Sequence, residues 1–284
     1  MASVTFALLI AEATLHICGI SYPRFYTADA VLGYMHRPGA RGLWNKEGNV
    51  YVQINSAGMR DKEHAREKPA GTIRIAVLGD SYAEAFQVSS QETFWAVMEW
   101  ELETCVSKYG KKVEVLNFGV SGYGTAQELL MLQHRAWEYS PDIVVLAITP
   151  ANDICNNSRE LEHDSSRPYF VYRGDKLSLD NAYLSGWKYK KTGYLRYVNL
   201  VQRASDSSRI LQVIMHAYTI LKLRTISPAI NQNAQFESGL ANAAFFEPIN
   251  LIWKEAWKVT KGLIGLMDEE VRKHGARFLV SCHA

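Results

Sequence analysis

The sequence predicts an α/β fold, a three-layer α/β/α sandwich in which a parallel sheet of at least four strands lies between helices. Two observations indicate this class. From residue 72 onward, short apolar runs of the kind that form buried parallel strands alternate with longer segments of helical spacing. Regular alternation of strand and helix also implies right-handed crossovers, which place helices on both faces of the sheet.

The strands are expected at residues 73–78, 113–118, 143–148 and 276–281, and helices at residues 93–109, 125–139 and 249–271. Apolar residues in the last helix repeat every three or four positions and form one face, which includes Trp253 and Trp257. We expect these tryptophans to pack on the sheet rather than to bind a ligand. Gly275 is suited to terminate this helix.

Composition indicates a globular protein and gives no reason to expect nucleic acid as a partner. The chain has 284 residues, 48% of them hydrophobic and 21% charged, and a net charge of +2 without a basic stripe. Its cysteines have no C-x-x-C spacing, so neither a zinc site nor a disulfide framework is expected. Cys155 and Cys282 both follow predicted strand ends and could be neighbours, but packing thiols are the commoner state.

The first of three expected parts, residues 1–21, is an apolar helix that ends at Gly19. Glu12 and His16 interrupt the apolar run before it reaches the length of about 20 residues that a bilayer requires. No positive charge precedes it and no small-residue cleavage site follows it, so it is a poor signal peptide. Two interpretations stay open: an amphipathic helix of a cytoplasmic protein, or the remnant of an anchor that holds an extracytoplasmic protein at a membrane.

Residues 22–71 form the second part, an extension of short strands and loops that glycines and prolines punctuate. Residues 49–54 alternate like a strand, residues 55–58 form a turn, and a polar linker follows at residues 61–71. The third part, residues 72–284, contains the sheet and an insertion at 156–248. The insertion is expected to hold a hairpin at 168–179 and a helix at 195–223. An aromatic, basic tract at 187–191 could contact an anionic surface or stack on sugars, although a solvated loop is the commoner state of such a tract.

Polar, glycine-bearing segments follow three of the strands: Gly79-Asp80-Ser81, then residues 117–125, then residues 150–153. The carboxyl ends of parallel strands meet at one edge of a sheet, so these segments converge. Ser81 would begin a helix, where free backbone N–H groups favour developing negative charge, and is a candidate nucleophile. The amides of Ser81 and Gly122 and the Asn152 carboxamide would then bind the oxyanion.

Each of these segments also has a structural interpretation. Asp80 or Ser81 could simply cap the next helix, and residues 152–153 could be a second cap. The glycine segment could be a phosphate cradle or a turn. Taken singly, each segment is more typical of a structural role. Because all three occur in one chain and each follows a strand, together they favour a catalytic site.

The three segments resemble the successive blocks of the SGNH (GDSL) hydrolases, which are serine esterases, lipases and acyl-transferring relatives. The matching residues are Leu78-Gly79-Asp80-Ser81, Asn117-Phe118-Gly119-Val120-Ser121-Gly122 and Asn152-Asp153. The resemblance implies a flavodoxin-like sandwich of strand order 2-1-3-4-5, with Ser81 as nucleophile and with Gly122 and Asn152 in the oxyanion hole. Residues 54–61 also look like the segment that precedes the domain in bacterial, often membrane-anchored, members.

The chain departs from this family in two places. Pro150 stands where the third block usually opens with glycine, and the Asp-x-x-His block that supplies the family's acid and base would follow the last strand. We therefore expect a carboxyl-terminal piece to be missing and the activity of this chain to be low, because an unassisted serine is a weak nucleophile. His64, which follows Asp61 at the family spacing, His163 and His283 are the alternative bases.

The sequence thus predicts a hydrolase that cleaves or transfers a short acyl or acetyl ester, on a small molecule, a glycan or a lipid, through an acyl-enzyme at Ser81. No cofactor and no metal are expected. The alternatives are a non-catalytic glycan- or lipid-binding module of the same fold and a metal-dependent phosphoesterase. The latter lacks the Asp-x-His pair and histidine clusters of two-metal sites.

Overall fold

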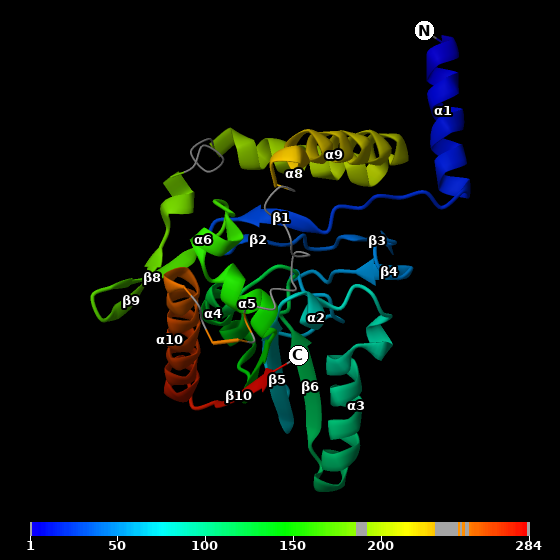
Figure 1. The fold of residues 1–284 in the computed structure, drawn as a ribbon. Coiled ribbons are helices and arrows are strands. Elements are labelled where there is room, and N and C mark those ends of the chain that lie inside the picture. Colours follow the sequence, from blue (N-terminus) through cyan, green and yellow to red (C-terminus); the bar gives the residue numbers. More distant parts are fainter. Residues whose placement is uncertain (1, 186–191, 231–243, 245, 248–249, 283–284) are drawn as a thin grey trace.

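A computed structural model describes residues 2–185, 192–230, 244, 246–247 and 250–282. Its centre is a sheet of strand order β6-β5-β7-β10, in which all neighbouring strands are parallel (Figure 1). These strands are β5 (Thr72–Gly79), β6 (Lys112–Asn117), β7 (Ile143–Ile148) and β10 (Arg277–Cys282). They lie where the sequence predicted them, in the order that the family resemblance implied for the first four strands.

Helices cover both faces of the sheet, which confirms the predicted sandwich (Figure 1). The principal covering helices are α3 (Phe94–Val106), α4 (Thr125–His134) and α10 (Leu251–Lys273). Ile75 and Val77 of β5 pack with Trp95 of α3. Ala76 and Leu78, which point to the opposite face, pack in the larger cluster that α4 and α10 complete. Both faces of β5 are therefore buried, as its continuous apolar run predicted.

The helices that follow β6 and precede β10 differ from expectation. The helix expected at residues 125–139 ends at His134, and the short helix η3 (Ala136–Tyr139) follows. The prediction that Trp253 and Trp257 pack on the sheet was wrong. They pack instead beside Ile154 of α5 (Pro150–Asn156), because the first turns of α10 run along that helix. The sheet-facing residues lie further along α10, at Val259, Leu263, Met267 and Val271.

The region predicted as short strands and loops contains two antiparallel hairpins. They pair β1 (Tyr26–Asp29) with β2 (Gly33–His36) and β3 (Arg41–Trp44) with β4 (Val50–Gln53). The turn predicted at residues 55–58 is present, and Gly58 adopts a positive φ of 86° there. Leu32 and Met59 are buried in the same cluster as Leu78 of the central sheet. The extension therefore packs directly on the sandwich.

Helix α1 (Ala2–Ile17) projects away from the sandwich (Figure 1). It is held near its end, where the Glu12 carboxylate accepts hydrogen bonds from the amides of Arg209 and Ile210 at 2.6 and 3.1 Å. Most of its other side chains are exposed, among them Phe6 and Leu9. None of the described helices is both long enough and apolar enough to cross a membrane.

The insertion confirms the predicted hairpin, formed by β8 (Tyr169–Arg173) and β9 (Lys176–Asp180). The single helix expected at residues 195–223 is two helices, α8 (Thr192–Ser207) and α9 (Arg209–Ile230). The break falls at Ser208, whose hydroxyl accepts a hydrogen bond from the amide of Leu211 and so caps the second helix. The tract at residues 187–191 lies outside the described residues.

The remaining helices are short. They are α2 (Ser81–Glu84), α6 (Arg159–Glu162), η1 (Ser90–Glu92), η2 (Ser107–Tyr109) and η4 (Ala182–Ser185). All four cysteines are free. Burial raises the pKa of Cys155 to about 11, so this thiol stays protonated at neutral pH. Cys155 and Cys282 are thus not bonded to each other, and both are unpaired thiols, the commoner state for cysteine.

Candidate active site

Ser81 lies directly after the central strand, on the first turn of α2. The Asp80 carboxylate accepts a hydrogen bond from the amide of Tyr82 at 3.0 Å, so Asp80 caps the helix, as the structural interpretation proposed. The helix is a single turn that ends at Ala85, which has a positive φ of 54°. The favourable potential at Ser81 therefore comes from nearby N–H groups more than from a long helix dipole.

Two glycines allow α2 to lie against the strand ends. A Cβ at Gly79 would lie 2.8 Å from the Cβ of Ala83 and 3.0 Å from the carbonyl oxygen of Ala147. A Cβ at Gly119 would lie only 2.5 Å from the same Ala83 Cβ. The distances of 2.8 and 2.5 Å to the Ala83 Cβ are too short for a side chain at either position, so these glycines allow the backbone segments to approach closely. They fix how deeply Ser81 sits against the sheet.

The segment after β6 curves around the start of α2. The Asn117 side chain accepts a hydrogen bond from the amide of Gly119 at 2.9 Å, and the amide of Val120 donates to the carbonyl of Gly79 at 3.0 Å. Gly122 is exposed and has a φ of 75°, a conformation that residues with a side chain rarely adopt. Glycine at this position is therefore required by the turn itself.

The amides of Ser81 and Gly122 are not paired with any acceptor in the part of the chain that the structure describes. The Ser81 hydroxyl likewise has no hydrogen-bond partner among these residues, and Ser81 is half-buried. An unpaired backbone N–H is uncommon in folded proteins unless it meets water or a ligand. Ser81 thus has an unpaired amide of its own, and a second unpaired amide lies on the segment that Val120 and Ser121 tie to Gly79 and to the serine helix.

Asn152 lies on the first turn of α5, next to Asp80. Pro150, which departs from the family pattern, occupies the first position of this helix, where its missing N–H and fixed φ fit well. The Asn152 side-chain amide donates to the Asp80 carboxylate at 2.8 Å. Burial raises the pKa of Asp80, and the hydrogen bond from Asn152 acts in the opposite direction. A primary amide has two N–H groups, so one remains for a further acceptor.

Glu84 joins the serine helix to the Gly122 segment, and the sequence alone did not reveal this role. Its Oε1 accepts a hydrogen bond from the amide of Ser121 at 3.0 Å. The same oxygen contacts the Tyr26 hydroxyl at 2.8 Å and Nε2 of His36 at 2.6 Å. Tyr26 and His36 come from the first hairpin of the extension, in which no recognisable motif marks them. Only a long-range contact map would have found them.

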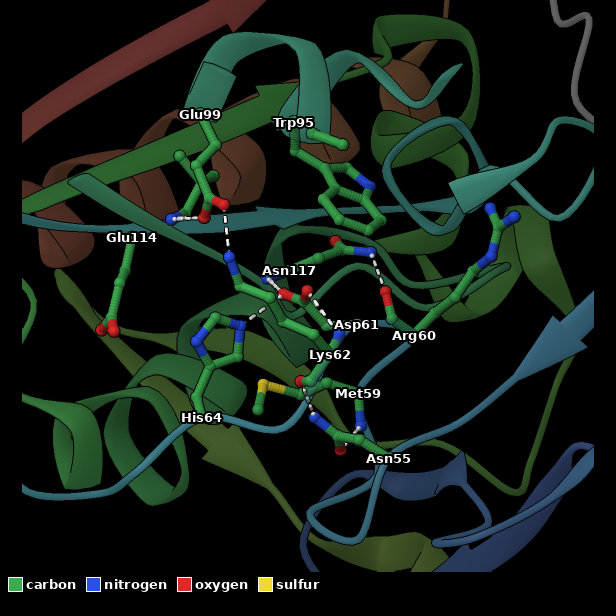
Figure 2. Close-up of polar contacts among 12 residues, drawn as sticks. Asn55, Met59, Arg60, Asp61, Lys62, His64, Trp95, Glu99, Glu114 and Asn117 are labelled. Carbon is green, nitrogen blue, oxygen red and sulfur yellow. Dashed lines mark hydrogen bonds and ion pairs between the residues drawn. The ribbon is translucent and has the colours of Figure 1, made fainter. Parts of the chain in front are cut away.

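The candidate base His64 pairs with Asp61 and not with Ser81. Their Nε2 and Oδ2 atoms are 3.1 Å apart, and both side chains are almost fully buried. Figure 2 shows the pair beneath Asn117, whose backbone amide donates to the same Asp61 carboxylate at 3.0 Å. The pair thus serves the outer edge of β6.

The other two candidate bases do not contact Ser81 either. His163 is exposed at the end of α6 with a positive φ of 56°, and His283 lies outside the described residues. No polar contact between a histidine and Ser81 occurs in the described ranges. Groups of three or more His, Cys, Asp or Glu side chains that could bind a metal ion are also absent from those ranges.

Comparisons with known proteins give similarity to solved structures alone. No protein-family model matches the chain, and no curated protein matches it. TesA is 24% identical over 29% of this chain and 49% of its own length, with a TM-score of 0.23. AlinE4, an SGNH-hydrolase family esterase, is 23% identical over 34% of this chain and 55% of its own length, with a TM-score of 0.24.

A mutant of the esterase AlinE4 aligns with more of the chain, at 15% identity over 72% of this chain and 98% of its own length, again with a TM-score of 0.24. For TesA and the first AlinE4 structure, the chain spans only about half of the solved protein. SGNH-hydrolase family esterases are therefore among the structural neighbours of this chain. Because the TM-scores are low, a function for this chain has to be inferred from its own site.

Proposed function

We propose that this chain is a serine hydrolase of the SGNH type, which acts on ester bonds through an acyl-enzyme at Ser81. The observation that carries the proposal is that the amides of Ser81 and Gly122 and the Ser81 hydroxyl all lack a hydrogen-bond partner among the described residues. The Asn152 side-chain amide is the third donor. One of its N–H groups donates to Asp80, and the other has no hydrogen-bond acceptor among the described residues. This is the donor set that a tetrahedral oxyanion needs.

In the proposed reaction, the Ser81 hydroxyl oxygen attacks the carbonyl carbon of the ester and releases its proton to solvent water, and the carbonyl oxygen becomes an oxyanion. The donors stabilise this charge, and loss of one such donor typically lowers the rate about 100- to 1000-fold. Collapse of the intermediate breaks the bond to the alkoxide, which takes a proton from solvent and leaves as the alcohol, and the product is an acyl-serine. Water or an acceptor hydroxyl then attacks the acyl group and frees Ser81. The substrate class we propose is a short acyl or acetyl ester, on a small molecule, a glycan or a lipid.

A non-catalytic binding module of the same fold is the second candidate. The observation that favours it is that the histidines of the described part contact groups other than Ser81. A binding module would hold an ester-bearing ligand without cleaving it. Even without a base, an oxyanion hole and substrate binding can raise the rate of ester hydrolysis about 1000-fold over water. A hydrolase and a binding module should therefore differ in a measurable rate of ester hydrolysis.

Labelling of the full chain with a fluorophosphonate probe tests the proposal. The Ser81 oxygen would displace fluoride from phosphorus and form a stable adduct. We expect the wild-type chain and a Ser107→Ala control, which removes an exposed serine after α3, to label equally, with or without EDTA. Ser81→Ala should not label. Absence of labelling in the wild type, or equal labelling of Ser81→Ala, would refute the serine mechanism, and loss with EDTA would favour a metal-dependent enzyme.

A further inference from the structure

We infer that Tyr34 is a positioning residue for the proposed oxyanion hole, because its hydroxyl fixes the orientation of the peptide bond that carries the Gly122 amide. Tyr34 lies on β2 in the extension, far from Gly122 in the sequence. Its hydroxyl donates a hydrogen bond to the carbonyl oxygen of Ser121 at 2.8 Å. The inference rests on the proposed function and assigns the extension a part in it.

Peptide geometry connects this hydrogen bond to the oxyanion hole. The Ser121 carbonyl and the Gly122 N–H belong to the same peptide unit. In a trans peptide these two groups point in opposite directions, and none of the described peptide bonds is cis. The Tyr34 hydroxyl, by holding the carbonyl, therefore turns the N–H away from the hairpin. Gly122 is the least restricted residue type in φ and ψ, so an external hydrogen bond to its peptide unit narrows the orientations that the N–H can adopt.

Contacts on either side of this peptide hold its neighbours as well. The amide of Ser121 donates to Glu84 on the serine helix at 3.0 Å, so the preceding peptide unit is tied to the element that carries Ser81. The carbonyl of Gly122 accepts hydrogen bonds from the side chains of Asn156, at 3.2 Å, and Arg167. The Ser121 amide, the Ser121 carbonyl and the Gly122 carbonyl thus each have a hydrogen-bond partner, whereas the Gly122 N–H has none among the described residues.

Tyr34 is itself rigidly held. Its carbonyl accepts a hydrogen bond from the Tyr123 hydroxyl, and its ring meets that of Tyr123 edge to face with centroids 5.4 Å apart. The Tyr34 hydroxyl lies so close to Gly122 that a Cβ there would be 2.8 Å away. Burial raises the pKa of Tyr34, so its hydroxyl stays protonated and remains a donor.

The test is Tyr34→Phe, which removes the hydroxyl and keeps the ring. The matched control is Tyr183→Phe, which also removes a tyrosine hydroxyl bonded to backbone carbonyls, those of Ala30 and Val31. Hydrolysis of p-nitrophenyl acetate is measured, and kcat is expressed per serine titrated with the fluorophosphonate, so unfolded molecules do not count. We expect Tyr34→Phe to lower kcat about 10- to 100-fold, below the effect of deleting a donor outright, with little change in KM.

A second readout separates positioning from packing. Phenylboronic acid forms a tetrahedral adduct with the serine oxygen and places a negatively charged oxygen in the hole, so its affinity should fall in parallel with kcat. If Tyr34→Phe matches Tyr183→Phe in kcat per titrated site and in boronate affinity, Tyr34 has no positioning role although the hydrolase remains. If the wild type neither labels nor hydrolyses the ester, the proposed function fails and this inference fails with it.

Discussion

Gly122 is the residue at which backbone conformation and the proposed chemistry depend on each other most directly. Alanine there would adopt a φ near 75° at a cost of about 1–2 kcal/mol, and its Cβ would meet the Tyr34 hydroxyl. We expect Gly122→Ala to displace the amide and to lower the fluorophosphonate labelling rate about 100-fold or more. Gly174→Ala is the control, since Gly174 has a φ of 64° but open space around its Cβ. Equal labelling rates would contradict this prediction.

Glu128 is a buried carboxyl group whose two oxygens have no hydrogen-bond partner in the described structure. Burial, together with the nearby Asp153, raises the pKa of Glu128 well above its ordinary value. The folded chain thus keeps a proton that the unfolded chain releases near pH 4.5. The stability from this group is complete below that pH and is lost as pH rises toward the folded pKa, at up to about 1.4 kcal/mol per pH unit.

Glu128→Gln cannot ionise, so we expect it to have a higher free energy of unfolding than the wild type at pH 8, with the difference shrinking toward pH 4. Urea denaturation across this pH range measures it. As a control, Glu101→Gln, which alters an exposed residue of α3, should have the same free energy of unfolding as the wild type at every pH. A Glu128→Gln variant that is less stable than the wild type at pH 8 would show that the carboxyl is ionised and partnered.

At the scale of elements, the sequence predicted the strands and the motifs at their ends because buried parallel strands form short apolar runs. It did not predict how the ends are held together. Glu84 and Tyr34 contact Ser121 across long separations in sequence, and the extension that supplies Tyr34 has no motif to mark it. The sequence also did not predict where α2 ends, because nothing in the sequence marks Ala85 as an alanine with a positive φ.

The outer edge of β6 is covered by carboxylates in place of a further strand. The backbone N–H groups of β6 that point away from β5 donate to side-chain carboxylates. The amide of Val113 donates to Glu103 at 2.6 Å, that of Val115 to Glu99 at 2.8 Å, and that of Asn117 to Asp61 at 3.0 Å. Figure 2 shows Glu99 and Asp61 at this edge, with Lys62 reaching Glu99. Charged groups of this kind prevent an edge strand from pairing with another chain.

Removal of one of these carboxylates should expose the edge. We expect Glu99→Ala to lower the free energy of unfolding by about 1–3 kcal/mol, because the Val115 amide loses its acceptor. Glu101→Ala, on the exposed side of the same helix, should cost less than about 0.5 kcal/mol. Urea denaturation measures both, and light scattering reports any association through β6. Equal stability of the two variants would mean that water replaces the carboxylate without cost.

At the scale of the whole molecule, the extension and the sandwich share one hydrophobic cluster. Leu32, which follows β1, is fully buried in the cluster that contains Leu78 of β5 and Phe118. Its carbonyl also accepts a hydrogen bond from the Gln127 side chain of α4 at 2.7 Å. A shared core of this kind predicts that the two parts unfold together, and that the hairpin carrying Tyr34 cannot detach without cost to the site.

Leu32→Ala tests this coupling. Deletion of a fully buried leucine side chain typically costs about 2–5 kcal/mol. If the core is shared, the variant loses this stability in one cooperative transition, and far-UV circular dichroism and tryptophan fluorescence give the same urea midpoint. Leu200→Ala, at a leucine that is 69% exposed on α8, should change the midpoint little. Two separate transitions, with only the first one shifted by Leu32→Ala, would show that the extension folds independently of the sandwich, and labelling of Ser81 would then survive its unfolding.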